Sequence, residues 1–404
     1  MKKITFMHAA DLHLDSPFKG LTQLPSSLFE EVRQSTFHAF DTLINKAIDY
    51  QIDFLLLVGD LFDHEEQSLK AQIHLRNAFL KLQTNHIQVY LSYGNHDFIH
   101  KNNHQVTFPE NVSVFKSEQV QSFFYERDGE RLAEINGFSY ESRAVTESKI
   151  DEYPSRNQNV PFQIGMLHGA IYGNTVHHSY APFQMEELKG KGYDYWALGH
   201  IHQRAILNET PPIIYPGNIQ GRHRREPGDK GCYLVEMTSL ETTVTYIPLY
   251  QIEFFNVEVD LSGVEDINDA ENKLWQSLKQ QKKTAMLIHL TWKNVAPNQF
   301  GARTGEYLSD LIELFNDQEI GVSPWRFIYK EKVQFKKIEE QKINRLFLED
   351  AQKAFNMLDV QKELSELLQH PQGRKFLDLP TNQALLAEAE ETLMRRLFQK
   401  GEGD

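Results

Sequence analysis

One stretch limits what this chain can fold into more than any other: residues 52–63, Ile-Asp-Phe-Leu-Leu-Leu-Val-Gly-Asp-Leu-Phe-Asp. Its apolar core is too short to span a membrane, and it is unbroken, whereas a half-exposed strand alternates apolar with polar residues. The pattern therefore predicts a strand that is buried on both faces of a sheet. The run ends at Gly59-Asp60. A buried carboxylate is costly unless a cation or hydrogen-bond donors compensate it, so we expect such a group opposite Asp60.

The chain around this strand alternates strands with helices. We expect strands at residues 4–9 and 87–91 and helices at residues 27–50 and 67–83. Ser27 followed by Glu30 is a capping-box pattern, which marks the start of the first helix. The order strand, helix, strand, helix, strand indicates βαβ crossovers and hence a parallel sheet.

Beyond Phe108 the expected strands are shorter and lose the helices between them. Their spacing and turn residues predict a second, largely antiparallel sheet that packs on the first. We expect these strands at residues 112–115, 133–140, 163–167, 193–198, 213–215, 232–237 and 243–248. Together with the first sheet they would make a domain over residues 1–250.

The remainder of the chain changes character twice. Residues 251–335 combine a few strands and helices on a smaller scale, which predicts a small α+β domain. Residues 336–404 are poor in strand patterns and rich in Glu, Lys, Gln and Leu. This last segment predicts two or three amphipathic helices, interrupted near Pro371 and Pro380.

Polar residues with metal-binding chemistry follow several of the apolar runs. Ligands gathered beyond strand ends are where open α/β sheets usually place a site. Each motif alone also fits a turn or a hydrogen-bonded core histidine, and only the ensemble favours a metal site. The candidates are Asp11, His13, Asp60, Asn95, His96, His168, His200 and His202.

The chemistry of this set indicates the kind of cation. Imidazole, carboxylate and amide oxygen together suit Mn²⁺, Fe²⁺ or Zn²⁺ better than an all-oxygen Mg²⁺ or Ca²⁺ site, and the absence of thiolates argues against structural zinc. Two ions about 3.5 to 4 Å apart need a group that bridges them, which a carboxylate does naturally. Asp60 is the candidate for that bridge.

The five segments Asp11-Leu-His13, Gly59-Asp60, Gly94-Asn-His-Asp97, His168-Gly169 and Gly199-His-Ile-His202, in this order, resemble the calcineurin-like metallophosphoesterases. Within that superfamily the chain is most similar to the SbcD-type DNA repair exonucleases, especially a Bacillus-type branch of about this length. The resemblance covers residues 4 to about 250. It implies an α/β fold, a four-layer α/β/β/α metallophosphoesterase sandwich, with a small α+β capping domain and a helical C-terminal tail.

The resemblance also implies a division of the ligands between two divalent ions, with Mn²⁺ favoured. The first ion would take Asp11, His13, Asp60 and His202, and the second would take Asp60, Asn95, His168 and His200. His96 lies outside both ligand sets and would stabilise or protonate the leaving oxygen.

Asp63 is a departure from the SbcD pattern. These nucleases often have histidine three residues beyond the bridging aspartate, whereas the serine/threonine phosphoprotein phosphatases have aspartate there. We therefore expect Asp63 to orient His96 and to raise its pKa, which favours the imidazolium form that serves as an acid.

Charge neither excludes nor establishes nucleic-acid binding. The formal net charge of −14 argues against a protein that coats polyanions without selectivity. A local cluster near the candidate site could still track a phosphate backbone, and a solvated basic loop explains it equally well. That cluster consists of Arg204, Arg222, Arg224 and Arg225.

The resemblance implies further partners. SbcD-type subunits use a C-terminal helical element to hold the coiled-coil base of an SMC-like ATPase, so the tail is predicted to dock there, although it could instead pack on its own chain. Such subunits commonly form homodimers, to which residues 69–82 could contribute. Without a signal-peptide core or a membrane-spanning run, and with the single cysteine Cys232, the protein is expected to be cytoplasmic and not to bind membranes.

The sequence thus predicts a metal-dependent phosphodiesterase that acts on DNA ends or hairpins. One alternative is a two-metal phosphatase or phosphodiesterase for a small nucleotide or a phosphoprotein, which the acidic charge and Asp63 favour. Another alternative is a scaffold for the ATPase with little catalysis.

Overall fold

The computed structural model describes residues 2–21, 23–63, 67–99, 106–172, 180–279, 284–296, 299–301 and 303–336, together with Lys353, Leu386 and Ala389. The chain divides into two compact units. The first unit comprises residues 1–16, 30–222 and 228–252, and the second comprises residues 17–29, 223–227 and 253–404. The predicted helical tail lies outside the described residues except at four positions, and the predicted domain bounds stay predictions.

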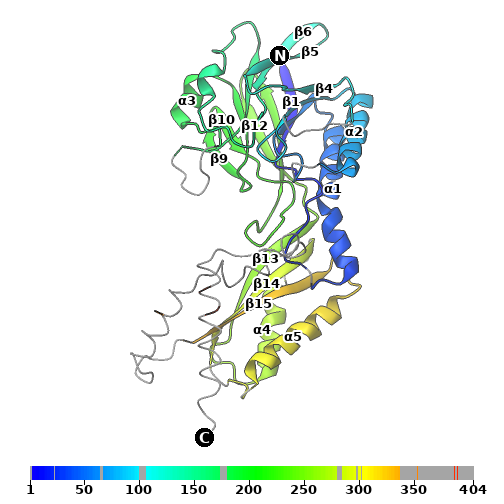
Figure 1. Cartoon of the computed structure of the whole chain (residues 1–404), viewed down its shortest axis with the longest axis vertical. Helices are drawn as coiled ribbons and strands as arrows, with labels where there is room; N and C mark the ends of the chain where they lie inside the picture. Colours follow the sequence, from blue (N-terminus) through cyan, green and yellow to red (C-terminus); the bar gives the residue numbers. More distant parts are fainter. Residues whose placement is uncertain are drawn as a thin grey trace. The chain divides into compact units, whose positions relative to one another are not determined.

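The first unit contains a six-stranded sheet in the order β12-β11-β1-β2-β3-β4 (Figure 1). Its strands β1 to β4 run parallel, whereas β11 and β12 are antiparallel to their neighbours. The alternation with helices predicts β1, β2 and β3, whereas β4, β11 and β12 were expected in the second sheet and belong to this one. The elements are β1 (Lys3–Ala10), α1 (Ser26–Asp49), β2 (Phe54–Val58), α2 (Leu69–Thr84), β3 (Gln88–Ser92), β4 (Val112–Val114), β11 (Gly231–Thr238) and β12 (Thr242–Pro248).

The second sheet of this unit has the order β5-β6-β7-β8-β10-β9. It corrects the predicted antiparallel arrangement: β6, β7, β8 and β10 are parallel to one another, and only β5 and β9 pair antiparallel. Loops and the short helix α3 make the crossovers here, so the helical signal of a parallel sheet is missing from the sequence. The elements are β5 (Gln121–Arg127), β6 (Glu130–Gly137), β7 (Phe162–His168), α3 (Met185–Gly190), β8 (Tyr195–Gly199), β9 (Ala205–Glu209) and β10 (Pro212–Tyr215).

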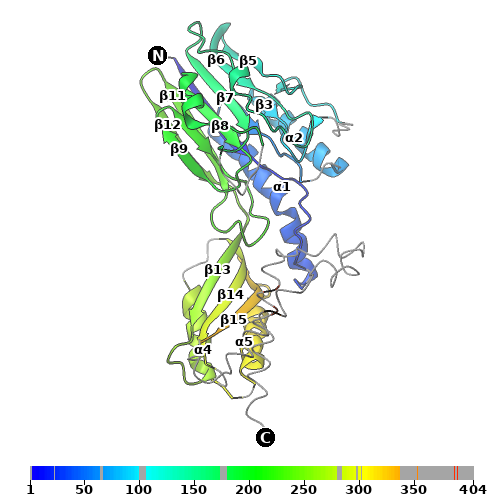
Figure 2. The ribbon, with the colours of Figure 1, turned by 60° about the vertical axis from the view of Figure 1, so that its left-hand side comes forward.

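Alternation along the strands separates three apolar layers. In β2, Leu55 and Leu57 pack with α1 and α2, whereas Phe54, Leu56 and Val58 face the second sheet. The far face of that sheet is covered by a third cluster, which includes Trp196 of β8 and Leu188 of α3. The unit is therefore an α/β sandwich of two sheets with helices on its outer faces, as the sequence predicts (Figure 2). All five residues of β2 are fully buried, which confirms the prediction from its unbroken apolar run.

The second unit has its own three-stranded sheet, β13-β14-β15, with a separate apolar core. Its buried ion pair joins Arg326 to Glu319. The elements are β13 (Ile252–Asp260), α4 (Ile267–Leu278), β14 (Ala285–Val295), α5 (Thr304–Glu319) and β15 (Arg326–Phe335), a mixture of strands and helices as the sequence predicts.

Helix starts were predicted less well. Helix α1 begins at Ser26 and the amide of Phe29 donates to the carbonyl of Pro25, so Ser27 lies in the first turn and does not cap it. Helix α2 has a side-chain cap, since the hydroxyl of Ser68 accepts from the amide of Ala71 at 3.1 Å. Among the described residues there is no helix that combines the length and the apolar character needed to cross a bilayer.

Candidate metal centre

Strand ends from both sheets of the first unit bring the candidate residues together. The pairing of β1 with β2 continues past the strands, because the amide of Asp11 donates to Gly59 O at 3.2 Å and that of His13 donates to Asp60 O at 3.0 Å. The amide of Gly59 in turn donates to Ser92 O at 3.1 Å. The carboxyl ends of parallel strands meet at one edge of a sheet, so these loops converge.

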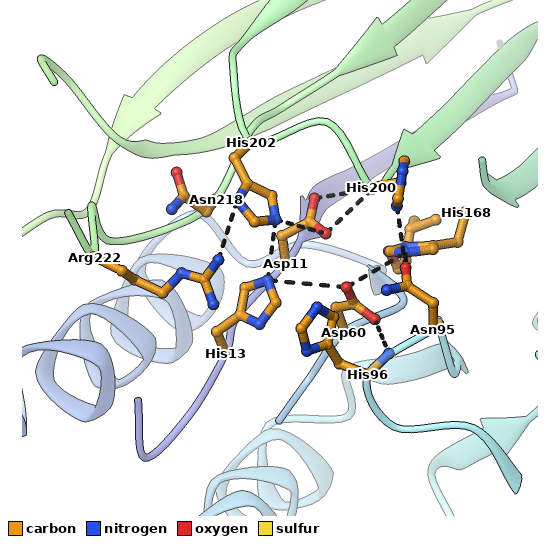
Figure 3. Close-up of polar contacts among 12 residues, drawn as sticks. Asp11, His13, Asp60, Asn95, His96, His168, His200, His202, Asn218 and Arg222 are labelled. Atoms are coloured by element: carbon orange, nitrogen blue, oxygen red, sulfur yellow. Dashed lines mark hydrogen bonds and ion pairs between the residues drawn. The ribbon is translucent and has the colours of Figure 1, made fainter. Parts of the chain in front are cut away.

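Two buried carboxylates occupy the middle of the site. Asp11 and Asp60 lie between two sets of nitrogen and amide ligands (Figure 3). Oδ1 of Asp60 accepts from the main-chain amide of His96 at 2.9 Å, which leaves Oδ2 facing His13 at 3.9 Å and His168 at 3.5 Å. One carboxylate thus reaches toward both sets of ligands.

The first set, which we call the His168 group, consists of Asn95, His168 and His200. Oδ1 of Asn95 lies 3.0 Å from both Nε2 of His168 and Nδ1 of His200. Nδ1 of His168 lies 3.0 Å from the carbonyl of Val58, so this nitrogen carries a proton and Nε2 is the atom that faces the site. The hydroxyl of Tyr140 donates to His168 O at 2.8 Å and holds the end of β7.

Three glycines leave space for the His168 ring. A Cβ on Gly59 would overlap the ring itself, and one on Gly94 would overlap Asp60 Oδ1 and approach His168 Nε2 to 2.7 Å. A Cβ on Gly199 would collide with the carbonyl of Val58 and lie 2.9 Å from His168 Nδ1. Glycine is therefore required beside these ligands because of close approach.

The second set, which we call the His13 group, consists of His13 and His202 together with the side chains of Asp63 and Arg222. Nε2 of His13 and Nε2 of His202 lie 3.1 Å apart. Nδ1 of His13 is 3.5 Å from Oδ1 of Asp63, which also pairs with Arg222. An Nη of Arg222 lies 3.2 Å from Nδ1 of His202. Charged side chains thus contact this pair of histidines.

Several ligand candidates have left-handed backbone. The φ angles are 52° at Asp11, 42° at His13, 50° at Asp60 and 95° at His200. Non-glycine residues in this region cost about 1 to 3 kcal/mol each and cluster at functional sites, because the surrounding structure must hold them there. The continuing backbone hydrogen bonds between the loops supply that constraint.

The electrostatics of the site call for a cation. Burial and the neighbouring charges of Arg222 and His202 lower the pKa of His13 well below its usual value, so His13 is neutral and able to ligate. Burial raises the pKa of Asp11, and the facing Asp60 raises it further. For His168, burial lowers the pKa, but the charge and hydrogen bond of Asp60 outweigh it and raise the pKa to about 9. The raised pKa means that Nε2 of His168 carries a proton, which a divalent cation would replace.

The residues present fit such a cation. The ligand atoms of Asp11, His13, Asp60 and His202 all lie within 4.8 Å of one another. Two histidine nitrogens at hydrogen-bond distance, facing two buried carboxylates, are the donor set that Mn²⁺, Fe²⁺ and Zn²⁺ prefer. These four residues are the ones that the family resemblance implies as ligands of the first ion.

Comparisons with known proteins agree with this geometry. The family model described as calcineurin-like phosphoesterase matches residues 4–204. The uncharacterized metallophosphoesterase YhaO of Bacillus subtilis is 35% identical over 385 residues, which cover 93% of this chain and 92% of the relative. The chain belongs to the calcineurin-like metallophosphoesterase family. It is accordingly a metal-dependent hydrolase that acts on phosphoester bonds.

Other relatives of this metallophosphoesterase are more distant. The DNA double-strand break repair protein Mre11 of Methanocaldococcus jannaschii is 28% identical over 67% of this chain and 72% of its own length. Its counterpart in Sulfurisphaera tokodaii is 23% identical over 85% of each chain. A solved dimetal phosphatase from Danio rerio covers 60% of this chain and 98% of its own at 9% identity, with a TM-score of 0.36, too low to inform the site.

The metallophosphoesterase site contains one residue whose importance the sequence reasoning missed. Oδ1 of Asp97 accepts from the amide of Gly94 and Oδ2 accepts from the amide of Leu61, both at 2.7 Å. Asp97 therefore ties the loop after β3 to the loop after β2. Burial and the nearby Asp60 raise the pKa of Asp97 to about 7. Its place in the motif Gly94-Asn-His-Asp97 was visible in the sequence, where it fitted a simple turn.

The structure corrects how Asp63 meets His96. Asp63 was expected to orient His96, and it contacts the ring through its main chain, because Nδ1 of His96 lies 2.9 Å from the carbonyl oxygen of Asp63. The carboxylate instead pairs with Arg222 and faces His13. The chain turns within this loop, so the carbonyl and the side chain of one residue point to different neighbours.

The four arginines predicted as one basic cluster lie in different surroundings. Arg222 is part of the His13 group, and Arg204 lies over the ring of Tyr246 with its Cζ 3.8 Å from the centroid. Arg224 and Arg225 belong to the second unit. The loop before Arg222 supports the site, because the amide of Asn218 donates to His202 O at 3.4 Å.

Proposed function

We propose that this chain is a two-metal nuclease of the SbcD type, which hydrolyses phosphodiester bonds at DNA ends or hairpins in the cytoplasm. Two divalent ions, Mn²⁺ in the first place, would be held by the two ligand groups with Asp60 between them. The tail would dock an SMC-like coiled-coil ATPase. A homodimer through residues 69–82 belongs to the same proposal, and Leu69 and Leu80 of α2 are exposed there.

The observation that carries the proposal is the position of Asp60. Its Oδ2 faces His13 of one group and His168 of the other, at 3.9 and 3.5 Å. A single carboxylate between two sets of candidate ligands is what a bridge between two ions requires. Asp11 adds the second negative charge, and Asn95 adds an amide oxygen.

The ions, when bound, supply Lewis-acid polarisation of the phosphoryl oxygens and an acidified water. The chain's own residues do the rest. The main-chain amide of His96 fixes the orientation of Asp60, and the carbonyl of Asp63 orients the ring of His96 by accepting from Nδ1. In the imidazolium form of the ring, Nε2 is then the atom that would deliver its proton to the leaving oxygen and leave the ring neutral.

The choice of DNA is supported by relatives that are named for DNA double-strand break repair. The rival substrate class, a small nucleotide or a phosphoprotein, is favoured by the net charge of −14. Arg222 does not separate the two, because its guanidinium pairs with Asp63 and would meet a phosphate of either substrate from the same place.

A side-by-side assay with Mn²⁺ decides between these substrates. Linear duplex DNA, hairpin DNA and a chromogenic phosphodiester are incubated with the full chain, and we expect cleavage of both DNA substrates. Cleavage of the chromogenic ester alone would overturn the nuclease proposal and leave the small-substrate alternative.

The role of His96 is tested separately with His96→Asn. We expect the turnover number to fall about 100-fold or more while the bound metal content is unchanged, because the ring is not among the ligands. Metal content is measured by elemental analysis after removal of free ions. Loss of metal together with activity would make His96 a structural residue.

A further inference from the structure

A small pocket in the second unit combines positive charge with an apolar wall. It has a cavity volume of about 60 Å³. Cationic side chains come from three separate segments: Lys19 from the loop before α1, Arg224 and Arg225 from the loop after β10, and Lys330 from β15. We propose that this pocket binds one phosphate group of a nucleic-acid strand.

The positive charge of the pocket is not neutralised from within. Lys19, Arg224, Arg225 and Lys330 form no ion pair with an acidic residue over the part of the chain that the structure describes. The acid of the same loop, Glu226, is buried and lies 3.5 Å from His223 Nε2. Like charges gathered without a partner repel one another, so an anion that binds among them relieves that repulsion.

The lining of the pocket indicates which anion it binds. The apolar side of the pocket is formed by Leu21, Phe254 and Tyr329, which are all buried. Phe254 and Tyr329 pack edge to face at 6.1 Å between centroids, so their faces are used within the unit and are not open for base stacking. Recognition at this place is therefore independent of sequence.

A nucleic-acid strand is favoured over free phosphate by the way the cations are arranged. Lys19 and Arg225 are exposed, whereas Arg224 and Lys330 are half-buried, so the charges continue from the cavity onto the surface where the chain of a polymer would pass. The loop also carries Arg222 of the metal centre two residues before Arg224. The choice of a strand rests on the proposed nuclease function, while the phosphate site itself does not.

The test compares two double variants that lose the same charge. Arg224→Gln/Lys330→Gln alters the pocket, and Lys279→Gln/Lys336→Gln alters lysines of the same unit outside it. Binding of a fluorescent single-stranded oligonucleotide is measured by anisotropy in EDTA, so that no cleavage occurs. We expect the pocket variant to bind about tenfold more weakly, as the loss of charge-assisted hydrogen bonds predicts.

Salt dependence identifies a phosphate contact directly. Loss of one phosphate contact lowers the slope of log K against log salt concentration by about 0.7 for a single strand. We expect this change in the pocket variant and an unchanged slope in the control. Equal affinity and slope in the two variants would overturn the proposal. Arg224→Lys/Lys330→Arg should restore the slope, and failure to do so would mean that the change acted on the fold.

Inorganic phosphate and a mononucleotide distinguish the source of the group. If they raise the unfolding temperature of the wild type but not of the pocket variant, while oligonucleotide binding is equal in both, the ligand is a free phosphate and the strand assignment fails. Because binding is read without metal, a failed cleavage assay leaves this result intact. A chain that cleaves DNA but shows no difference between variants would keep the nuclease function and lose the pocket.

Discussion

The two ligand groups of the metal centre hold their histidines in different ways. In the His168 group the main chain does so, through the carbonyl of Val58 and through glycines packed against the ring. In the His13 group, side chains with opposite charges do so, because Asp63 faces His13 while Arg222 pairs with Asp63 and contacts His202. His168 is almost fully buried, whereas the side chain of His202 is 23% exposed.

The two halves of the site therefore differ in the substitutions that they can tolerate. A ring held by backbone and by close packing has one tautomer and one position, so its ligand atom is fixed before a cation arrives. A pair of histidines held by an ion pair can adjust, and its affinity depends on charges that substitution removes easily. Substitutions in each group test this contrast.

The largest effect is expected from Asp60→Asn, which removes the carboxylate that faces both groups. We expect turnover to fall about a thousandfold, or about 4 kcal/mol of transition-state stabilisation, and bound metal to fall in both halves of the site. Activity and elemental analysis measure this, with the surface variant Asp128→Asn as control. If Asp60→Asn retained full cellular function, the scaffold alternative would replace the catalytic one.

Gly94→Ala should disturb the His168 group through packing alone. The added Cβ overlaps Asp60 Oδ1 and approaches His168 Nε2, so we expect metal affinity to fall by about 100-fold, at the upper end of the range for residues that support ligands. Gly190→Ala is the matched control, because nothing lies within 4 Å of its Cβ. Equal metal titrations for the two variants would show that close packing does not fix the His168 ring.

Asp63→Asn should weaken the His13 group by charge and leave the His168 group unaltered. We expect about a tenfold loss in the affinity of one of two ions. Arg222→Gln should act through the same ion pair, so the double variant should lose less than the sum of the two single effects. Strict additivity would mean that Asp63 and Arg222 act independently.

The pH profile of Asp63→Asn also decides how His96 is tuned. The variant keeps the carbonyl that accepts from Nδ1 of His96 but loses the carboxylate. A shift in the pH dependence of turnover would support the predicted tuning by the carboxylate. An unchanged profile with weaker metal binding would assign the carboxylate to the His13 group only.

The smallest effect concerns His8, which supports the strand that leads to His200 and His202. Its ring lies 3.0 Å from both the Tyr195 hydroxyl and Leu198 O, and burial lowers its pKa from 6.5 to about 3. Below pH 6.5 the unfolded chain binds a proton that the folded chain does not, so stability falls with falling pH. The expected slope is about 1.4 kcal/mol per pH unit until the folded pKa is reached.

His8→Asn removes this titration, and the comparison with the wild type isolates it from other buried groups. Urea unfolding in EDTA, repeated from pH 6.5 downwards, gives the two slopes. A wild-type slope no steeper than that of the variant would show that His8 does not stay neutral in the folded state.

Much of the site could be predicted because its residues follow apolar strands. An unbroken run such as that of β2 can only be a buried strand, and parallel strands place their ends together, so Asp11, Asp60 and Asn95 were expected at one edge. The parallel direction of most strands in the second sheet could not be predicted in this way. Its parallel crossovers contain loops where helices are usual, and loops carry no periodic signal.

Local chemistry could be predicted from the amino-acid sequence: which strands are buried, which residues end them, and that carboxylate, imidazole and amide ligands are all present. Contacts between loops of the folded chain fix how these residues are held. Asp97 joins two loops, glycines leave space for the ring of His168, and Arg222 forms an ion pair with Asp63. The physical reason is that burial and strand pattern are properties of neighbouring residues, whereas hydrogen bonds and ion pairs between loops depend on distances that the whole fold sets.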